Sequence, residues 1–273
     1  MHNYAIYIIL PIILYKSLLK KVIFCYNYGL SALRMKKIID LSPNFSKKKR
    51  SPRTIKYVIM HYTGMQSEIE SLKRLKNPSA AVSSHYLINK RGKIYQLVKD
   101  EHVAWHAGKS KWGKTKNLNK NSIGIELVNK GHKYGYENFP KSQIDSLIIL
   151  CKKLKRNYKI KKKNFLGHSD IAPLRKMDPG EKFPWKKLSK EKIGVWYKTD
   201  KQILKILDKN KKKTQFFINI HKMGYRYFNK KRRLRSDKKI IFAFQRRYLP
   251  LNVTGKIDEK TLQISSFLTN SKK

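Results

Sequence analysis

Acidic residues are scarce in this chain of 273 residues, because 17 Asp and Glu stand against 64 Lys and Arg and leave a formal net charge of +47. Two cysteines, Cys25 and Cys151, are too few for a disulfide-stapled scaffold or a cysteine-rich zinc finger. No apolar run reaches the roughly 18–20 residues that a membrane-spanning helix needs. These shortages exclude a small disulfide-bonded scaffold, and no membrane-spanning helix is predicted.

The hydrophobic content of 40%, with 11% aromatic residues, is enough to build a core, so wholesale disorder is excluded. The length suggests one medium domain and one small one. Lysine-rich runs such as Lys47–Arg50, Lys161–Lys163 and Lys211–Lys213 fall between periodic segments, as solvated loops do. Such charge raises affinity for any polyanion, but no paired-cysteine finger, aromatic RNA-reading strand or basic zipper accompanies it. Specific nucleic-acid binding is therefore not expected.

Residues 1–34 form an apolar and basic leader whose role the sequence leaves open. The apolar run Tyr4–Tyr15 has the length of a signal peptide, but its lysines follow the run instead of preceding it. Phe24 stands where a lipoprotein signal needs a small residue before Cys25. Met35 offers an alternative start, which would make the leader an upstream read-through.

Residues 55–197 alternate between strand and helix patterns, after a basic lead-in over residues 35–54. We predict a buried strand over 55–63, a hairpin over 85–98 and a further strand over 121–129. Ser67 and Glu70 form a capping box for a helix that ends near Asn77. Its inward residues are predicted to be Ile69, Leu72 and Leu75. A second helix is predicted to bury Ile144, Leu147, Ile148, Cys151 and Leu154.

The sequence pattern changes after residue 197, and a small helical module is predicted over residues 199–270. Ser236 and Asp258 are expected to be N-caps, and Gly224 is expected to end a helix. Pro250–Gly255 is expected to join two helices.

Five polar residues stand at predicted strand ends or in loops beside them: His61, Glu126, His168, Lys176 and Asp178. Two imidazoles and one carboxylate around zinc leave a fourth position open for water, as in catalytic zinc sites. The spacing alone is weak evidence, because a histidine at a strand end often has a structural role. The alternative to a functional role is an exposed strand carboxylate for Glu126 and a solvated surface lysine for Lys176.

A resemblance to a known family strengthens this interpretation. Residues 57–196 resemble the zinc-dependent N-acetylmuramoyl-L-alanine amidases of the AmpD/AmiD kind, which are related to phage amidase lysozymes and peptidoglycan recognition proteins. The matching segments are VIMHYTGM, VSSHYLINKRGKIYQLV, AWHAG, NSIGIELVN, GHSDIAPLRKMDPG and FPW. The resemblance implies that His61, His168 and Asp178 hold Zn²⁺. It also implies that Glu126 is the general base and that Lys176 stabilises the oxyanion.

Two further histidines, His85 and His106, are candidates for binding substrate, with a structural role as the alternative. The tail is similar to the three-helix peptidoglycan-binding module through MGYRYF, AFQRRY and VTGKIDEKTL, with a generic helical appendage as the alternative.

The expected fold is an α/β domain with a mixed central β-sheet flanked by helices, followed by a small all-α three-helix module. The resemblance implies hydrolysis of the amide between the lactyl group of N-acetylmuramic acid and L-alanine, in peptidoglycan or muropeptides. A non-catalytic peptidoglycan-binding protein and a basic nucleic-acid-binding protein are the alternatives. We expect a cell-envelope or periplasmic location, with membrane association left open and a cytoplasmic location as the alternative.

Overall fold

The computed structural model describes residues 37–197, 209–229 and 232–270. The leader, its start site and the predicted boundary near residue 199 lie outside these residues. All of these described residues belong to one compact unit. In the described part of the chain, no helix is long and apolar enough to cross a membrane.

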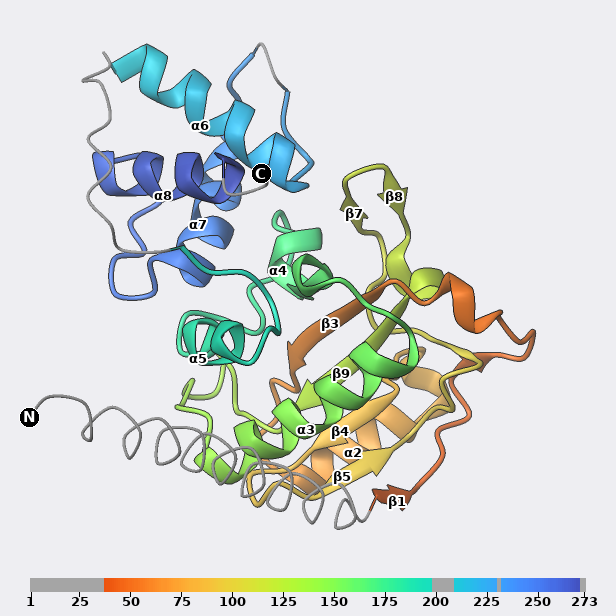
Figure 1. Cartoon of the computed structure of the whole chain (residues 1–273). Coiled ribbons are helices and arrows are strands. Elements are labelled where there is room, and N and C mark those ends of the chain that lie inside the picture. The colour runs from red at the N-terminus through yellow and green to blue at the C-terminus, as the bar shows by residue number, and fades with distance from the viewer. Residues whose placement is uncertain (1–36, 198–208, 230–231, 271–273) are drawn as a thin grey trace, which may run out of the picture. The chain divides into compact units, whose positions relative to one another are not determined.

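A six-stranded mixed sheet forms the centre of the structure (Figure 1), with the strand order β1-β5-β4-β9-β3-β10. Strands β4 and β5 pair antiparallel, and all other neighbours in this sheet are parallel. The six strands are β1 (Lys37–Ile39), β3 (Tyr57–Tyr62), β4 (Tyr86–Ile88), β5 (Ile94–Gln96), β9 (Ser122–Leu127) and β10 (Phe165–Gly167). The predicted strands and hairpin are confirmed, and the lead-in contributes the edge strand β1.

Two small antiparallel pairs lie outside the central sheet. One joins β2 (Phe45–Ser46) to β6 (Val103–Ala104), and the other joins β7 (Lys111–Trp112) to β8 (Thr115–Lys116).

Helices α3 (Lys141–Asn157) and α2 (Glu68–Lys76) flank the sheet, α3 in front of it and α2 behind it in the view of Figure 1. All five residues that were predicted to face inward from α3 are buried, including the free thiol of Cys151. In α2, Ser67 caps the helix as predicted by accepting a hydrogen bond from the Glu70 amide. The prediction for Ile69 is wrong, because its side chain is 66% exposed. Residues three apart drift by about 60° around a helix, so Ile69 and Leu75 do not share one face.

Among the described residues that follow the α/β part of the chain there are three helices: α6 (Lys209–Met223), α7 (Asp237–Tyr248) and α8 (Glu259–Asn270). Gly224 ends α6 with φ +133°, and Asp258 caps α8 by accepting from the Thr261 amide at 2.7 Å. Ser236 occupies the N-cap position of α7 as predicted, but its side chain makes no capping bond. The three-helix prediction is confirmed.

The helices α6 to α8 share one hydrophobic core with the sheet. Ile59 of β3 and Leu166 of β10 belong to the same buried cluster as Phe216 of α6 and Phe244 of α7. The Phe244 ring meets the Phe216 ring edge to face, with centroids 5.2 Å apart. Because this cluster is continuous, the helical region and the sheet stabilise one another.

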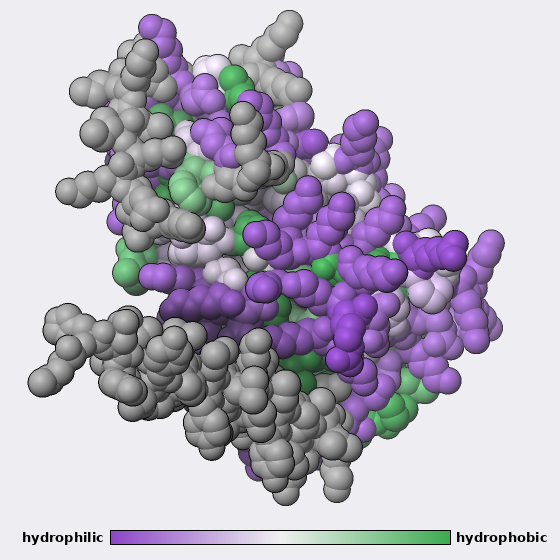
Figure 2. All heavy atoms as spheres, in the orientation of Figure 1, coloured by the Kyte–Doolittle hydropathy of each residue, from purple (hydrophilic) through white to green (hydrophobic). Residues whose placement is uncertain are grey.

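Two short helices, α4 (His168–Ile171) and α5 (Trp185–Lys190), lie between β10 and the helical region along the chain. Most Lys and Arg side chains of the described residues are exposed or half-buried, and Figure 2 shows that hydrophilic residues dominate the visible face.

We expect Phe244→Ala to destabilise the whole unit by about 3–5 kcal/mol, because it leaves a cavity in the shared core. Urea unfolding followed by far-UV circular dichroism and by tryptophan fluorescence should show one coincident transition at a lower midpoint. Leu251→Ala is the control, since Leu251 is fully exposed and its loss should change little. Two separate transitions, only one of them shifted, would contradict the shared core.

Candidate active site

The register of two parallel strands places His61 beside Glu126. His61 in β3 is paired directly with Glu126 in β9. Paired residues of neighbouring strands project from the same face of a sheet, so both side chains point to the same side. That face is the one opposite α3, and it forms the floor of the candidate site.

The strand on the other side of β3 supplies two more residues of the site. β10 runs parallel to β3 and ends at Gly167, where α4 begins with His168. The loop after α4 returns to the same place, since the Ser169 amide donates a hydrogen bond to the Asp178 carbonyl oxygen at 2.8 Å. This bond joins the segment that carries His168 to the segment that carries Asp178.

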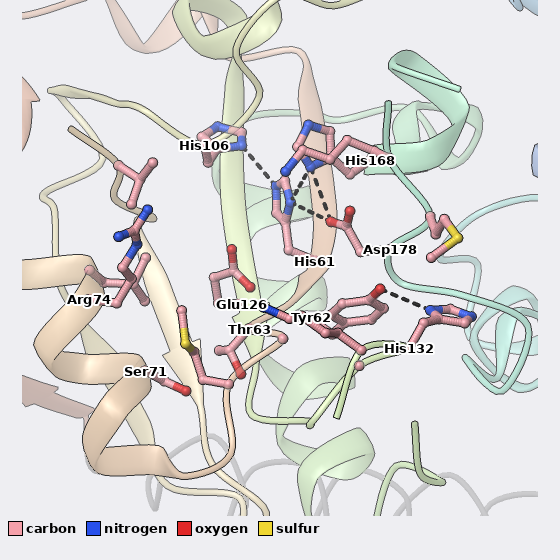
Figure 3. Close-up of a pocket in the computed structure, with 18 of the residues that line it drawn as sticks. His61, Tyr62, Thr63, Ser71, Arg74, His106, Glu126, His132, His168 and Asp178 are labelled. Carbon is pink, nitrogen blue, oxygen red and sulfur yellow. Dashed lines mark hydrogen bonds and ion pairs between the residues drawn. The ribbon is translucent and has the colours of Figure 1, made fainter. Parts of the chain in front are cut away.

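Three potential ligand atoms converge at this point (Figure 3). His61 Nδ1 lies 3.0 Å from His168 Nδ1 and 3.0 Å from Asp178 Oδ2, and His168 Nδ1 lies 3.1 Å from the same oxygen. All three side chains are buried. The structure thus brings together the two histidines and the aspartate that the sequence pointed to as metal ligands.

The outer nitrogens of the two histidines determine their tautomers. The Ser122 hydroxyl donates to the Leu118 carbonyl at 2.6 Å, so its oxygen accepts from His106 Nε2–H at 3.1 Å. His106 Nδ1 then accepts from His61 Nε2–H at 3.0 Å. His168 Nε2 lies 3.1 Å from the Ala107 carbonyl oxygen and 3.3 Å from Arg175 Nη2. Since Arg175 Nη2 already donates to the carbonyls of Ala107 and Lys109, we assign the proton to His168 Nε2, which donates to Ala107. Both Nδ1 atoms therefore carry lone pairs, as metal-binding imidazoles held by outer hydrogen bonds do.

Two imidazole nitrogens with lone pairs and a carboxylate oxygen thus face one another, and none of these three atoms carries a proton. Such an arrangement is repulsive unless a cation binds. The donor atoms of a tetrahedral site with bonds of about 2.0 Å lie roughly 3.3 Å apart, compared with 3.0–3.1 Å between these three atoms. Burial and the nearby His168 lower the pKa of His61 to about 4, so its imidazole is neutral at pH 7. Burial raises the pKa of the Asp178 carboxyl, and a proton on either histidine, in place of a metal ion, would lower it well below its usual range. These residues can hold a divalent metal ion.

A glycine in β9 makes room for the histidine behind His61. A Cβ atom at Gly124 would lie 2.4 Å from the His106 ring, which therefore packs directly on the strand backbone. The Gly124 amide also donates to His85 Nδ1 at 3.0 Å. His106 contacts the metal-ligand candidate His61 from this position, while its predicted contact with substrate stays a prediction.

His85 is buried beneath the same strand, where its ring meets that of His106 with centroids 5.6 Å apart. It is not among the described residues that line the cavity of the site. Its role in substrate binding likewise remains a prediction.

Glu126 has one carboxylate oxygen, Oε2, that is buried without a hydrogen-bond partner among the described residues. Burial, with a smaller contribution from Asp178, raises the pKa of this carboxyl to about 8, although Lys176 opposes the shift. The side chain points into the cavity in Figure 3, below the histidine cluster. An unpartnered carboxylate with a pKa near neutrality is suited to accept a proton.

The cavity around these groups has a volume of about 560 Å³. Lys176 lines it together with Arg74 of α2 and Lys133. Arg175 also lies at the cavity, but its guanidinium is engaged by the carbonyls of Ala107 and Lys109. Several basic groups thus surround the two carboxylates of the site.

One cluster at the cavity was not predicted from the sequence. The Tyr62 hydroxyl lies 2.9 Å from His132 Nδ1, and His132 Nε2 lies 3.1 Å from Glu181. Tyr136 stacks on the His132 ring with centroids 4.3 Å apart. His132 lies three residues after the predicted strand over 121–129, but nothing in its spacing links it to Tyr62 or Glu181.

Comparison with known proteins agrees with this geometry. Residues 51–181 match the family model described as N-acetylmuramoyl-L-alanine amidase. The chain is 35% identical over 230 residues to N-acetylmuramoyl-L-alanine amidase AmiD of Escherichia coli, covering 78% of this chain and 82% of that protein. It is 33% identical over 164 residues to 1,6-anhydro-N-acetylmuramyl-L-alanine amidase AmpD of Haemophilus influenzae, covering 54% of this chain and 86% of that one.

Among solved structures, the similarity covers more of the chain than the α/β part alone. Escherichia coli AmiD, in complex with the substrate anhydro-N-acetylmuramic acid-L-Ala-D-γ-Glu-L-Lys, superimposes with a TM-score of 0.70 at 32% identity. The match covers 83% of this chain and 93% of AmiD. The cluster of three potential ligand atoms, the adjacent carboxylate and these matches lead to one conclusion: this chain belongs to the N-acetylmuramoyl-L-alanine amidase family.

Proposed function

We propose that this amidase is zinc-dependent and hydrolyses the amide between the lactyl group of N-acetylmuramic acid and L-alanine, in peptidoglycan or its fragments. In this proposal His61, His168 and Asp178 hold the zinc ion. The observation that carries it is the convergence of three lone-pair atoms within 3.0–3.1 Å of one another, beside the unpartnered carboxylate oxygen of Glu126. Bound zinc would supply Lewis-acid chemistry, polarising a carbonyl oxygen and making water more acidic.

Glu126 is proposed to be the general base. Its carboxylate takes a proton from the water that attacks the amide carbon, and it then protonates the departing nitrogen of L-alanine. In the metal-free site burial raises the pKa of this carboxyl to about 8, and the positive charge of bound zinc would lower that value towards neutrality, where a carboxyl can both accept and release a proton.

Lys176 is proposed to stabilise the negative charge that develops on the carbonyl oxygen. It lines the same cavity as Glu126 and is close enough to lower the pKa of that carboxyl. An ammonium group held in a site partly shielded from water stabilises an oxyanion strongly. Arg74 and Lys133 add positive charge to the cavity wall, which suits a peptide that carries free carboxylates.

The helical region is proposed to bind the wall polymer. A second cavity of about 720 Å³ lies among α6, α7 and the loop before α8, and six Lys or Arg side chains line it against two Asp. Stem peptides of peptidoglycan carry carboxylates, so this charge would attract them. The cell-envelope location remains a proposal that accords with such a substrate.

The function is tested by incubating the chain with intact peptidoglycan and with a soluble anhydromuropeptide, and by analysing the released products by mass spectrometry. We expect free peptides that begin with L-alanine, their loss with a chelator and their return with zinc. Retention on intact peptidoglycan that high salt abolishes would support wall binding by charge.

His61→Ala and Asp178→Ala should lose both zinc and product release, whereas His102→Ala, outside the cavity lining, should keep both. Bound peptidoglycan without release, in the presence of zinc, would instead indicate a non-catalytic binding protein.

Glu126→Gln should keep zinc at full stoichiometry but lower turnover by roughly 10²–10⁴-fold, because the amide cannot accept the proton. Zinc content by atomic absorption and initial rates on the muropeptide check this. Glu101→Gln is the matched control, because Glu101 is exposed and pairs with Lys49 at the surface. Unchanged turnover in Glu126→Gln would assign Glu126 a structural role.

The raised pKa of Glu126 also predicts that, without metal, the difference in stability between the parent and Glu126→Gln depends on pH. Its folded pKa of about 8 exceeds the reference value of 4.5, so the folded state holds a proton that the unfolded state releases between these values. The carboxyl therefore destabilises the fold increasingly as pH rises through this window. Relative to the parent, Glu126→Gln should gain little at pH 4.5 and on the order of a few kcal/mol above pH 8. Urea unfolding in the presence of a chelator measures the difference, and a gain that does not grow with pH would contradict it.

A further inference from the structure

Asp170 lies two residues after His168 in α4, and its carboxylate is almost completely buried, with 1% of the residue exposed. The Gly167 amide donates to its Oδ2 at 2.8 Å, and the Tyr225 hydroxyl donates to its Oδ1 at 2.6 Å. Arg247 forms an ion pair with Oδ2. Both oxygens are therefore engaged, and two of the three partners come from the helical region.

Arg247 holds more than one element of the sheet domain. It projects from α7, and its Nη2 donates to the carbonyl of Phe165 in β10 at 3.0 Å. Its guanidinium also lies over the Trp185 ring of α5, 3.9 Å from the ring centroid. Arg247 thus contacts β10 before His168 and α4 after it.

Tyr225 follows α6 and is fully buried. Its ring packs edge to face on Trp112 of β7, with centroids 4.9 Å apart. Burial and the neighbouring Asp170 raise the pKa of the Tyr225 hydroxyl well above its usual range, so the hydroxyl stays protonated and donates.

These contacts reach both proposed ligands through the backbone. Asp170 holds α4, whose first residue is His168, and the next amide, Ser169, donates to the Asp178 carbonyl. A displacement of α4 would therefore move His168 and the Asp178 loop together, away from His61 on β3.

A fully buried Arg–Asp pair is costly, because both charges lose their hydration. An apolar contact could join two layers as firmly, but the planar guanidinium and the carboxylate also impose direction. Such a directional contact lies two residues from a proposed ligand, where orientation matters most.

We infer that Asp170, Arg247 and Tyr225 are positioning residues of the amidase site, through which the helical region orients His168 and Asp178. This inference rests on the proposed zinc site. It gives α6 and α7 a part in catalysis that does not depend on wall binding.

The test is Tyr225→Phe in the full chain, which removes one hydroxyl and keeps the buried ring. We expect zinc affinity, measured by competition with a chromophoric chelator, to fall on the order of tenfold. The kcat on the soluble muropeptide should fall by a similar factor while KM stays unchanged, because the change affects the geometry of the site and not substrate contacts.

Tyr227→Phe is the matched control. Tyr227 packs against the same core two residues away, but its buried hydroxyl has no hydrogen-bond partner in the described residues. Its loss should leave zinc affinity and kcat unchanged. If Tyr225→Phe matches this control in both readouts, or raises KM at constant kcat, the inference is wrong.

A second variant, Asp170→Asn, tests whether the effect passes through this carboxylate. We expect a loss of zinc affinity of about 10–100-fold, and the double variant with Tyr225→Phe should lose less than the product of the two single effects. Fully multiplicative losses would overturn the shared route through Asp170. A parent chain that neither binds zinc nor releases peptide would refute the proposed function itself, an outcome distinct from a parent that does both while the variants match it.

Discussion

Three atoms that all carry lone pairs, His61 Nδ1, His168 Nδ1 and Asp178 Oδ2, are held within 3.0–3.1 Å of one another. Without a cation this arrangement is unfavourable, so the rest of the fold must supply the restraint. The parallel pairing of β3 with β10 brings two of the three chain segments together. The Ser169–Asp178 backbone hydrogen bond adds the third. The sheet is thus the frame that makes a metal site possible.

In the hydrogen-bond chains around this cluster, each histidine donates to the group that lies further from the three atoms. From His61 they pass through His106 and Ser122 to a backbone carbonyl, and from His168 they pass directly to the carbonyl of Ala107. Each link fixes the orientation of the ring before it and keeps its inner nitrogen free for a metal. Glu126 is the exception, because its buried oxygen has no partner in the described residues. Such a buried, unpartnered carboxylate lowers the stability of the fold, and proteins retain a group of this kind where it serves function.

The helical region joins this frame through a continuous apolar core and one buried ion pair. Apolar side chains of α6 and α7 share a cluster with β3 and β10, and Arg247 reaches Asp170 within it. The surface differs from this core, because most Lys and Arg residues of the described part of the chain are exposed or half-buried in loops and on helix faces, where water solvates them. The large net charge is therefore compatible with an ordinary core, and it acts on partners at a distance.

Periodicity was sufficient for much of the fold. The strands around His61 and Glu126, the hairpin over 85–98 and the buried face of α3 follow from local patterns that one face of a sheet or helix imposes. One error arose where a pattern was too short to define a face. Ile69 is exposed because three-residue spacing drifts around a helix, and Ser236 stands at the N-cap position of α7 without making a side-chain capping bond.

The sequence by itself determined which residue types are available to the site, and the family motifs around them pointed to His61, His168, Asp178, Glu126 and Lys176. It did not determine how the site is supported. Asp170 stands inside a recognised motif, yet its partners Tyr225 and Arg247 lie 55 and 77 residues further along the chain. No local pattern relates such distant residues, because their contact depends on how the helices pack on the sheet. Only the tertiary structure decides that contact, since a buried charge needs its partner in space and not in sequence.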